Sequence, residues 1–188
     1  MNRILFLSIA VIIMAGCTSR KDKKVLSDVD NNPKNEITQD KIQLPVDLIK
    51  LITDSLDGYS IPTKEDYDTK VNSFIESIPY PYFCKDDFDG NREIDYAFLL
   101  KSSDNRLSFF IFNNINDNFQ IINMGSIPMG ISEKGITTII SIKEKGNWFA
   151  FDTTIFVPNN GISLELLEES RTNSYYWDGS RYQRFFED

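Results

Sequence analysis

The second half of the chain is a succession of short apolar and aromatic runs separated by polar breaks. Runs of this length, rich in β-branched and aromatic residues, are typical of strands, and the breaks carry the Asn, Asp, Gly and Ser of tight turns. Short breaks between strands favour antiparallel pairing. Asp178-Gly179, between two aromatic runs, predicts a tight hairpin. The expected strands are 96–102, 106–113, 119–125, 137–143, 148–152, 154–157, 162–168, 174–177 and 181–186.

Two stretches ahead of these runs have helical periodicity. The first begins near Pro45, which suits a first helical turn, and Gly58 is its expected stop. The second begins at Thr63, whose hydroxyl can cap a helix with Asp66 three residues later, and it ends at Pro79. Their apolar positions recur at helical spacing. These positions are Val46, Ile49, Ile52 and Leu56 in the first stretch, and Val71, Phe74, Ile75 and Ile78 in the second.

Together these patterns predict an α+β fold. We expect two short N-terminal helices packed on a mainly antiparallel sheet of about six to eight strands. The expected organisation is a signal peptide over 1–16, a disordered tether over 17–40 and a single α+β domain over 41–188. The tether is predicted from its many charges and few large apolar side chains.

The first residues predict export and a lipid anchor. One arginine precedes an apolar run from Ile4 to Ala15, which is too short to span a bilayer as a mature helix. Ala15 and Gly16 directly before Cys17 resemble the lipobox of bacterial lipoproteins, in which the cysteine is lipidated. The resemblance implies palmitate on Cys17 and a place in the bacterial cell envelope, the outer membrane being favoured over the inner. The alternative is an ordinary export signal with an incidental cysteine.

Composition excludes several classes of function. The net charge of −8 argues against a nucleic-acid partner, because binding to phosphates needs clustered lysine and arginine. The chain has no histidine, which removes the commonest general base and zinc ligand. With Cys17 carrying lipid, Cys84 has no disulfide partner within the chain. Its apolar and aromatic neighbours predict a buried, unreactive thiol.

One loop has the composition of a cation site. In the stretch DDFDGNREIDY, over 86–96, oxygen-bearing side chains alternate around Gly90. Calcium takes six to eight oxygen ligands, which a loop can supply from alternate residues. The candidate ligands are Asp87, Asp89, Asn91, Asp95 and the backbone carbonyl of Glu93. The alternative is a polar turn whose side chains cap backbone amides without a metal.

The loop resembles the FG-GAP or VCBS-type calcium loop of integrin-like propeller blades. Asp87, Asp89, Gly90, Asn91 and Asp95 match that pattern, and 96–100 supplies the strand that follows it. Arginine stands at 92, where the pattern has a second glycine. The resemblance implies a bound Ca²⁺, but it occurs once, whereas a propeller repeats its blade. The wider arrangement is similar to small exported bacterial lipoproteins.

Two classes of function follow. The first is a lipid-anchored binding or interaction module of the envelope, stabilised by one calcium ion, with an envelope protein or a glycan as partner. A particular form is an inhibitor or immunity-type lipoprotein. The second is an envelope hydrolase that uses acidic residues, although no recognised catalytic motif accompanies them. An enzyme is the less favoured of the two.

Overall fold

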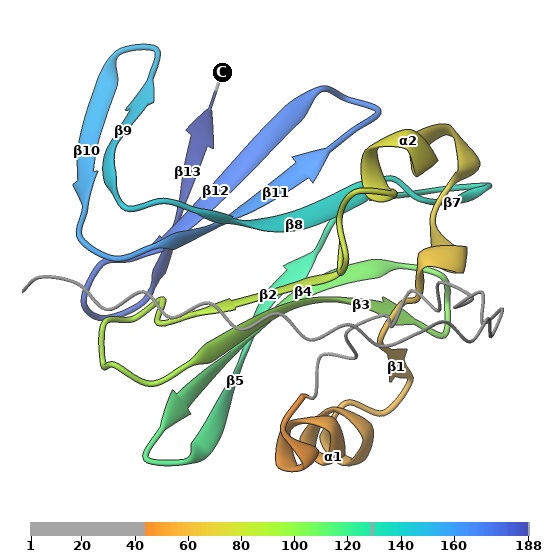
Figure 1. The fold of residues 1–188 in the computed structure, drawn as a ribbon, viewed down its shortest axis with the longest axis horizontal. Coiled ribbons are helices and arrows are strands. Elements are labelled where there is room, and N and C mark those ends of the chain that lie inside the picture. Colours follow the sequence, from red (N-terminus) through yellow and green to blue (C-terminus); the bar gives the residue numbers. More distant parts are fainter. Residues whose placement is uncertain (1–43, 129, 188) are drawn as a thin grey trace, which may run out of the picture. The chain divides into compact units, whose positions relative to one another are not determined.

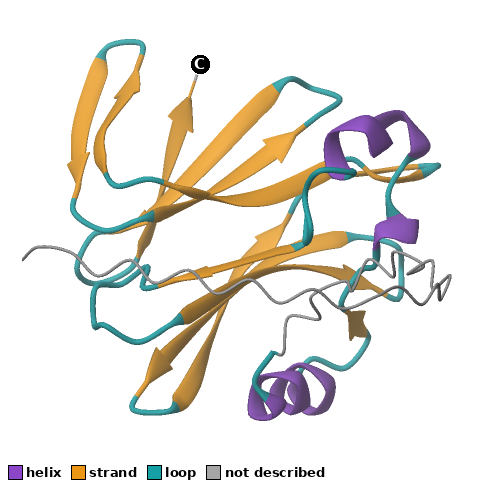
Figure 2. Cartoon of the chain, in the orientation of Figure 1, coloured by secondary structure: helices purple, strands orange, loops and turns teal. Residues whose placement is uncertain are grey.

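The computed structural model describes residues 44–128 and 130–187 (Figure 1), all of which belong to one compact unit, Ile42–Asp188. The predicted signal peptide and tether lie outside the described residues. Of the described residues, 50% are in strands and 14% are helical. Figure 2 shows that strands make up most of the fold. The α+β prediction is therefore wrong, and the domain is mostly β.

The first sheet is built largely from strands that follow one another along the chain. Its order is β1-β3-β4-β5, with β2 also paired to β3, and every pairing is antiparallel. Short connections between consecutive strands explain this pattern, because a tight turn can only join antiparallel neighbours. The strands are β1 (Tyr59–Ser60), β2 (Phe83–Asp86), β3 (Asp95–Ser102), β4 (Leu107–Ile115) and β5 (Asn118–Ser126).

The second sheet has the order β13-β12-β11-β8 and is also antiparallel. The predicted hairpin at Asp178-Gly179 joins β12 to β13. Its four-residue loop is closed by Asp178, whose carboxylate accepts the backbone N–H groups of Ser180 and Arg181 at 2.9 Å. The strands of the sheet are β8 (Thr138–Lys143), β11 (Gly161–Leu166), β12 (Arg171–Trp177) and β13 (Tyr182–Glu187).

Two further hairpins form two-stranded sheets of their own, not paired with either main sheet. They are formed by β6 (Ile131–Ser132) with β7 (Gly135–Ile136), and by β9 (Gly146–Ala150) with β10 (Thr153–Val157). Strands β9 and β10 interrupt the second sheet in sequence, between β8 and β11.

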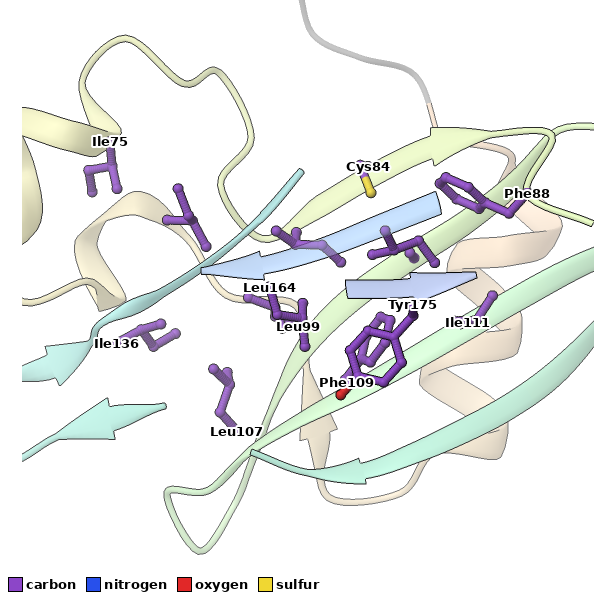
Figure 3. Close-up of a cluster of buried hydrophobic side chains, with 14 of the residues drawn as sticks. Ile75, Cys84, Phe88, Leu99, Leu107, Phe109, Ile111, Ile136, Leu164 and Tyr175 are labelled. Carbon is purple, nitrogen blue, oxygen red and sulfur yellow. The ribbon is translucent and has the colours of Figure 1, made fainter. Parts of the chain in front are cut away.

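The main core lies between the two sheets. Leu99 and Phe109 of the first sheet belong to the same buried cluster as Ile140, Leu164 and Tyr175 of the second (Figure 3). The rings of Phe109 and Tyr175 are 5.0 Å apart. The predicted single sheet is thus two sheets packed face to face, because each presents one apolar face that has to be removed from water.

The opposite face of the first sheet is covered by the first predicted helix. This helix, α1 (Val46–Ser55), buries Leu48 and Ile52 against Phe98 and Phe110. Side chains on both faces of β4 are therefore buried, and its residues from Leu107 to Asn113 all lie inside the protein.

The second predicted helix, from Thr63 to Pro79, does not form as one element. The chain instead takes a 3₁₀ turn, then two extended residues, Tyr67 and Asp68, a second 3₁₀ turn and one α-helical turn. Asp68 is the point of interruption. Its carboxylate accepts the N–H of Lys70 at 3.0 Å, and its own N–H donates to the carbonyl of Ile136 at 3.0 Å. The three short helices are η1 (Lys64–Asp66), η2 (Thr69–Val71) and α2 (Asn72–Ile75).

The β9–β10 hairpin forms a third layer on part of the outer face of the second sheet. Trp148 and Val157 of the hairpin share a buried cluster with Phe185 of β13. A Cβ on Gly161 would lie 2.3 Å from the Trp148 ring, so only glycine allows this close approach. The hairpin's other face is open to solvent.

Candidate metal centre

The acidic stretch forms the connection between β2 and β3. These strands pair antiparallel up to Asp86 and Asp95, which lie opposite each other. Gly90 and Arg92 take positive φ angles of 83° and 75°, so the chain turns sharply twice. A Cβ at Gly90 would approach the side-chain amide of Asn159 to 2.5 Å. The positive φ at this turn favours glycine, and the end of the Asn159 side chain would have to move to admit a Cβ.

The carboxylate of Asp95 lies at the base of this loop and is fully buried. Its Oδ2 accepts the backbone N–H groups of Phe88 at 2.9 Å and Asp89 at 3.3 Å. Its Oδ1 accepts the N–H of Asn114, on β4, at 2.8 Å. Asp95 therefore ties the acidic loop to the neighbouring strand.

Asp87 and Asp89 shape the loop above it. Asp87 accepts the N–H of Gly90 at 2.8 Å and that of Arg92 at 2.9 Å. Asp89 accepts the N–H of Asn91 at 3.0 Å. One carboxylate oxygen from each of Asp87, Asp89 and Asp95 lies within 4.8 Å of the other two. The three acids could together hold a metal ion, because they present their oxygens to one point.

The other two predicted ligands make different contacts. The side-chain oxygen of Asn91 accepts the N–H of Glu93 at 2.7 Å, and the amide group donates to the carbonyl of Asn114 at 2.7 Å. The carboxylate of Glu93 accepts the N–H of Asn116 at 2.8 Å. Ligand roles for Asn91 and Glu93 stay predictions.

Burial is the main influence on the pKa values of Asp95 and Asp89. It raises the pKa of Asp95 to about 7, against the opposing effect of the N–H of Asn114, and the nearby charge of Asp89 adds to the rise. Burial also raises the pKa of Asp89. Both shifts mean that the empty site disfavours the ionised carboxylates, whereas a bound cation would favour them.

No protein-family model, curated protein or solved structure matches this chain.

The surroundings of the loop contain residues that the sequence did not predict for this site. Asn113 donates from its amide to Asp89 at 3.2 Å and accepts the hydroxyl proton of Tyr182 at 2.8 Å. Asn160 donates to Asp86 at 2.9 Å. The available signal was the polar pair Asn113-Asn114 at the end of an otherwise apolar run. Nothing in the sequence placed that strand end beside the acidic loop.

The structure describes only one of the two cysteines. Cys17 lies outside the described residues, so its lipidation stays a prediction. Cys84, on β2, is free and buried, and burial raises the pKa of its thiol well above the usual range. A neutral buried thiol is a poor nucleophile.

Two pockets bear on the hydrolase alternative. A shallow depression of about 520 Å³ contains Asp66, whose carboxylate is paired with Lys101 at 2.8 Å. A smaller pocket of about 90 Å³ is lined by Arg171 and Arg184 but by no acid. Neither pocket brings two carboxylates to face each other, which acid–base hydrolysis by acidic residues needs.

No helix among residues 44–128 and 130–187 is long and apolar enough to cross a bilayer.

Proposed function

We propose that this chain is a lipid-anchored binding module of the bacterial envelope, in which the loop from Asp87 to Asp95 holds one calcium ion. The observation that carries the metal part is the convergence of three carboxylates on one point. The anchor is supported by the apolar run before Cys17.

Calcium suits the donor set better than other metals do. The three acids supply oxygen only, and calcium is a hard cation that prefers oxygen ligands. Zinc prefers histidine and cysteine, and the chain has no histidine. Magnesium demands stricter octahedral geometry than a flexible loop provides.

The proposed role of the ion is structural. The loop region already contacts two other parts of the fold. Asp95 contacts β4, while Asp86 and Gly90 lie against the adjacent residues Asn160 and Asn159. A cation among the carboxylates would cancel their mutual repulsion and hold these parts together. It would leave the rest of the surface free for an envelope partner, either a protein or a glycan.

Thermal unfolding tests the calcium site. At a free calcium concentration ten times the dissociation constant, the ion should add about 1.4 kcal/mol to the free energy of unfolding. That corresponds to a rise of a few degrees in Tm. The Tm of the purified full chain in detergent is measured in millimolar calcium, in magnesium and in chelator.

Variants assign the effect to the loop. Asp89→Ala should remove the calcium-dependent rise, while Asp152→Ala, which removes an exposed acid outside the loop, should keep it. Equal Tm values for the unmodified chain in calcium and in chelator would leave the polar turn as the correct description.

The anchor is tested by labelling cells with palmitate. Cys17→Ser should abolish incorporation and release the protein from membranes, because the lipid is the proposed attachment. Cys84→Ala is the matched control, since it removes the other cysteine, which is buried, and should leave labelling unchanged. Labelled, membrane-bound Cys17→Ser protein would contradict the anchor.

A further inference from the structure

The pocket of about 90 Å³ lies on the side of the domain where β5 and β13 are the edge strands. Its wall on one sheet comes from Phe109 and the end of β5, including Met124. Its wall on the other sheet comes from β11, β12 and β13, with Leu164 and Leu166. Apolar side chains from both sheets therefore line the pocket.

Two arginines reach the same pocket from the second sheet. Arg184 lies opposite Tyr175 in the β12–β13 register. Cross-strand partners lie on the same face of a sheet, and Tyr175 belongs to the core between the sheets. Arg184 therefore projects from the inward face of an edge strand. Arg171 reaches the pocket from the start of β12.

The charge of Arg184 has no carboxylate partner among the described side chains. Its Nη2 donates to Oδ1 of Asn173 at 2.6 Å, and its guanidinium group lies over the Phe186 ring at 4.2 Å. Arg171 has one long ion pair, with Glu169 at 3.4 Å. In a chain of net charge −8, two guanidinium groups at one pocket, one of them without an acid, are unusual.

The neighbouring polar side chains also offer hydrogen-bond donors. Asn173 is buried, and because its oxygen accepts from Arg184, its NH₂ group is the part left for a ligand. Tyr175 also lines the pocket. The pocket thus combines an apolar wall with donors, two of which carry a permanent positive charge.

We infer that this pocket binds a carboxylate that bears a small aliphatic group. A guanidinium group pairs with a carboxylate through parallel N–H···O bonds, and the aliphatic group would lie against Met124 and Ile127, which line the pocket and are partly exposed. An apolar cavity of about 150 Å³ accepts benzene, so about 90 Å³ limits the group to a few carbons. The ligand is either a free short-chain acid or the C-terminus of a peptide ending in an aliphatic residue.

Titration calorimetry of the full chain in detergent tests the site. The first probe is 3-methylbutanoate, and its neutral control is 3-methylbutanamide, which has the same shape without the charge. For so small a ligand we expect a dissociation constant of about a millimolar. The amide should bind at least about tenfold more weakly, because it loses the charge-assisted bonds.

A second pair of probes separates the two sources. N-acetyl-glycyl-glycyl-leucine carries the same carboxylate on a peptide, and its C-terminal amide is the control. Tighter binding of the peptide acid than of 3-methylbutanoate supports a peptide C-terminus. Equal or weaker binding of the peptide acid supports a free acid.

Variants place the site. Arg184→Gln should lower the affinity for 3-methylbutanoate by about tenfold. Arg181→Gln, at the exposed turn outside the pocket, should leave this affinity unchanged. Both variants should stay folded, because both arginines are exposed, and thermal melting of each variant checks that the domain is intact. Binding should be the same in calcium and in chelator, which separates this site from the proposed metal centre.

Three results would overturn the inference. They are an absence of heat with both acids, equal affinity for acid and amide, and an equal loss of affinity in Arg184→Gln and Arg181→Gln.

Discussion

The carboxylate of Asp95 lies fully buried between the acidic loop and β4. Three backbone N–H groups point at it, yet burial raises its pKa to about 7. Burial therefore favours the protonated form of Asp95, whereas a nearby cation would favour the ionised form.

The pKa of Asp95 predicts how stability depends on pH. An unfolded aspartate has a pKa of about 3.9, so between pH 4 and 7 the unfolded chain is ionised there while the folded chain is not. Stability should fall as pH rises through this window, by at most about 1.4 kcal/mol per pH unit. Urea unfolding of the unmodified chain and of Asp95→Asn, at pH 5 and pH 7.5 in chelator, measures the difference.

The asparagine does not titrate, so the unmodified chain should lose stability relative to Asp95→Asn at the higher pH. Calcium should reduce that loss, because the cation favours the ionised form. A difference between the two proteins that is the same at both pH values would mean that Asp95 is ionised throughout.

The sequence predicted the three converging acids but not their partners. Asp87, Asp89 and Asp95 lie in one short loop, where alternation alone indicates that their oxygens can meet. Asn113 and Asn160 come from distant strands, and their contacts depend on which strands pair. Local spacing carries no information on such pairings.

At the scale of elements, the β9–β10 hairpin carries both a buried and an exposed aromatic side chain. Trp148 is 3% exposed and packs on the second sheet, whereas Phe151 is 94% exposed at the hairpin's end. Trp148 lies within β9, whereas Phe151 lies in the turn that joins β9 to β10, beyond the last paired residue, Ala150. Both residues lie in the same aromatic run of the sequence, but only Trp148 should contribute strongly to the free energy of unfolding.

Alanine substitutions should reveal this difference. Trp148→Ala leaves a cavity against Phe185 and should lower the free energy of unfolding by about 3–5 kcal/mol. Phe151→Ala should change it by no more than about 0.5 kcal/mol. Urea unfolding measures both, and similar losses in the two variants would contradict the hairpin's placement.

The helix predicted from Thr63 to Pro79 does not form, which shows that the spacing of apolar residues alone did not determine the structure there. The apolar stripe was real, since Val71 and Ile75 are buried. However, Asp68 uses its side chain to cap a new turn and its backbone to bind Ile136. Aspartate competes in this way for backbone groups, and the partner strand lies far along the sequence. The first helix, α1, has no such competing contact and forms nearly as predicted.

For the whole molecule, the sequence predicted strands better than sheets. Most expected runs form strands. The division into two sheets was missed, because turn residues specify that neighbouring strands pair but not where a sheet ends. The connection after β5, which leads to the second sheet, resembles other breaks in composition.

Because one core joins the two sheets, they should unfold together. Trp148 and Trp177 are the two tryptophans, and both lie in the half of the chain that forms the second sheet. Tryptophan fluorescence therefore reports on that half, while far-UV circular dichroism reports on both sheets. The two urea transitions should coincide. Separate midpoints would show that the sheets are independent units.

The pairing of consecutive strands also bears on how the chain acquires its structure. Strands β2 to β5 pair with their sequence neighbours, and so do β11 to β13. Such contacts close short loops, which lowers the contact order and favours rapid folding for a β protein. The first sheet needs no residue beyond β5 for its own pairings, so it can begin to assemble before the second sheet has formed. The second sheet then meets a complementary apolar face that already exists.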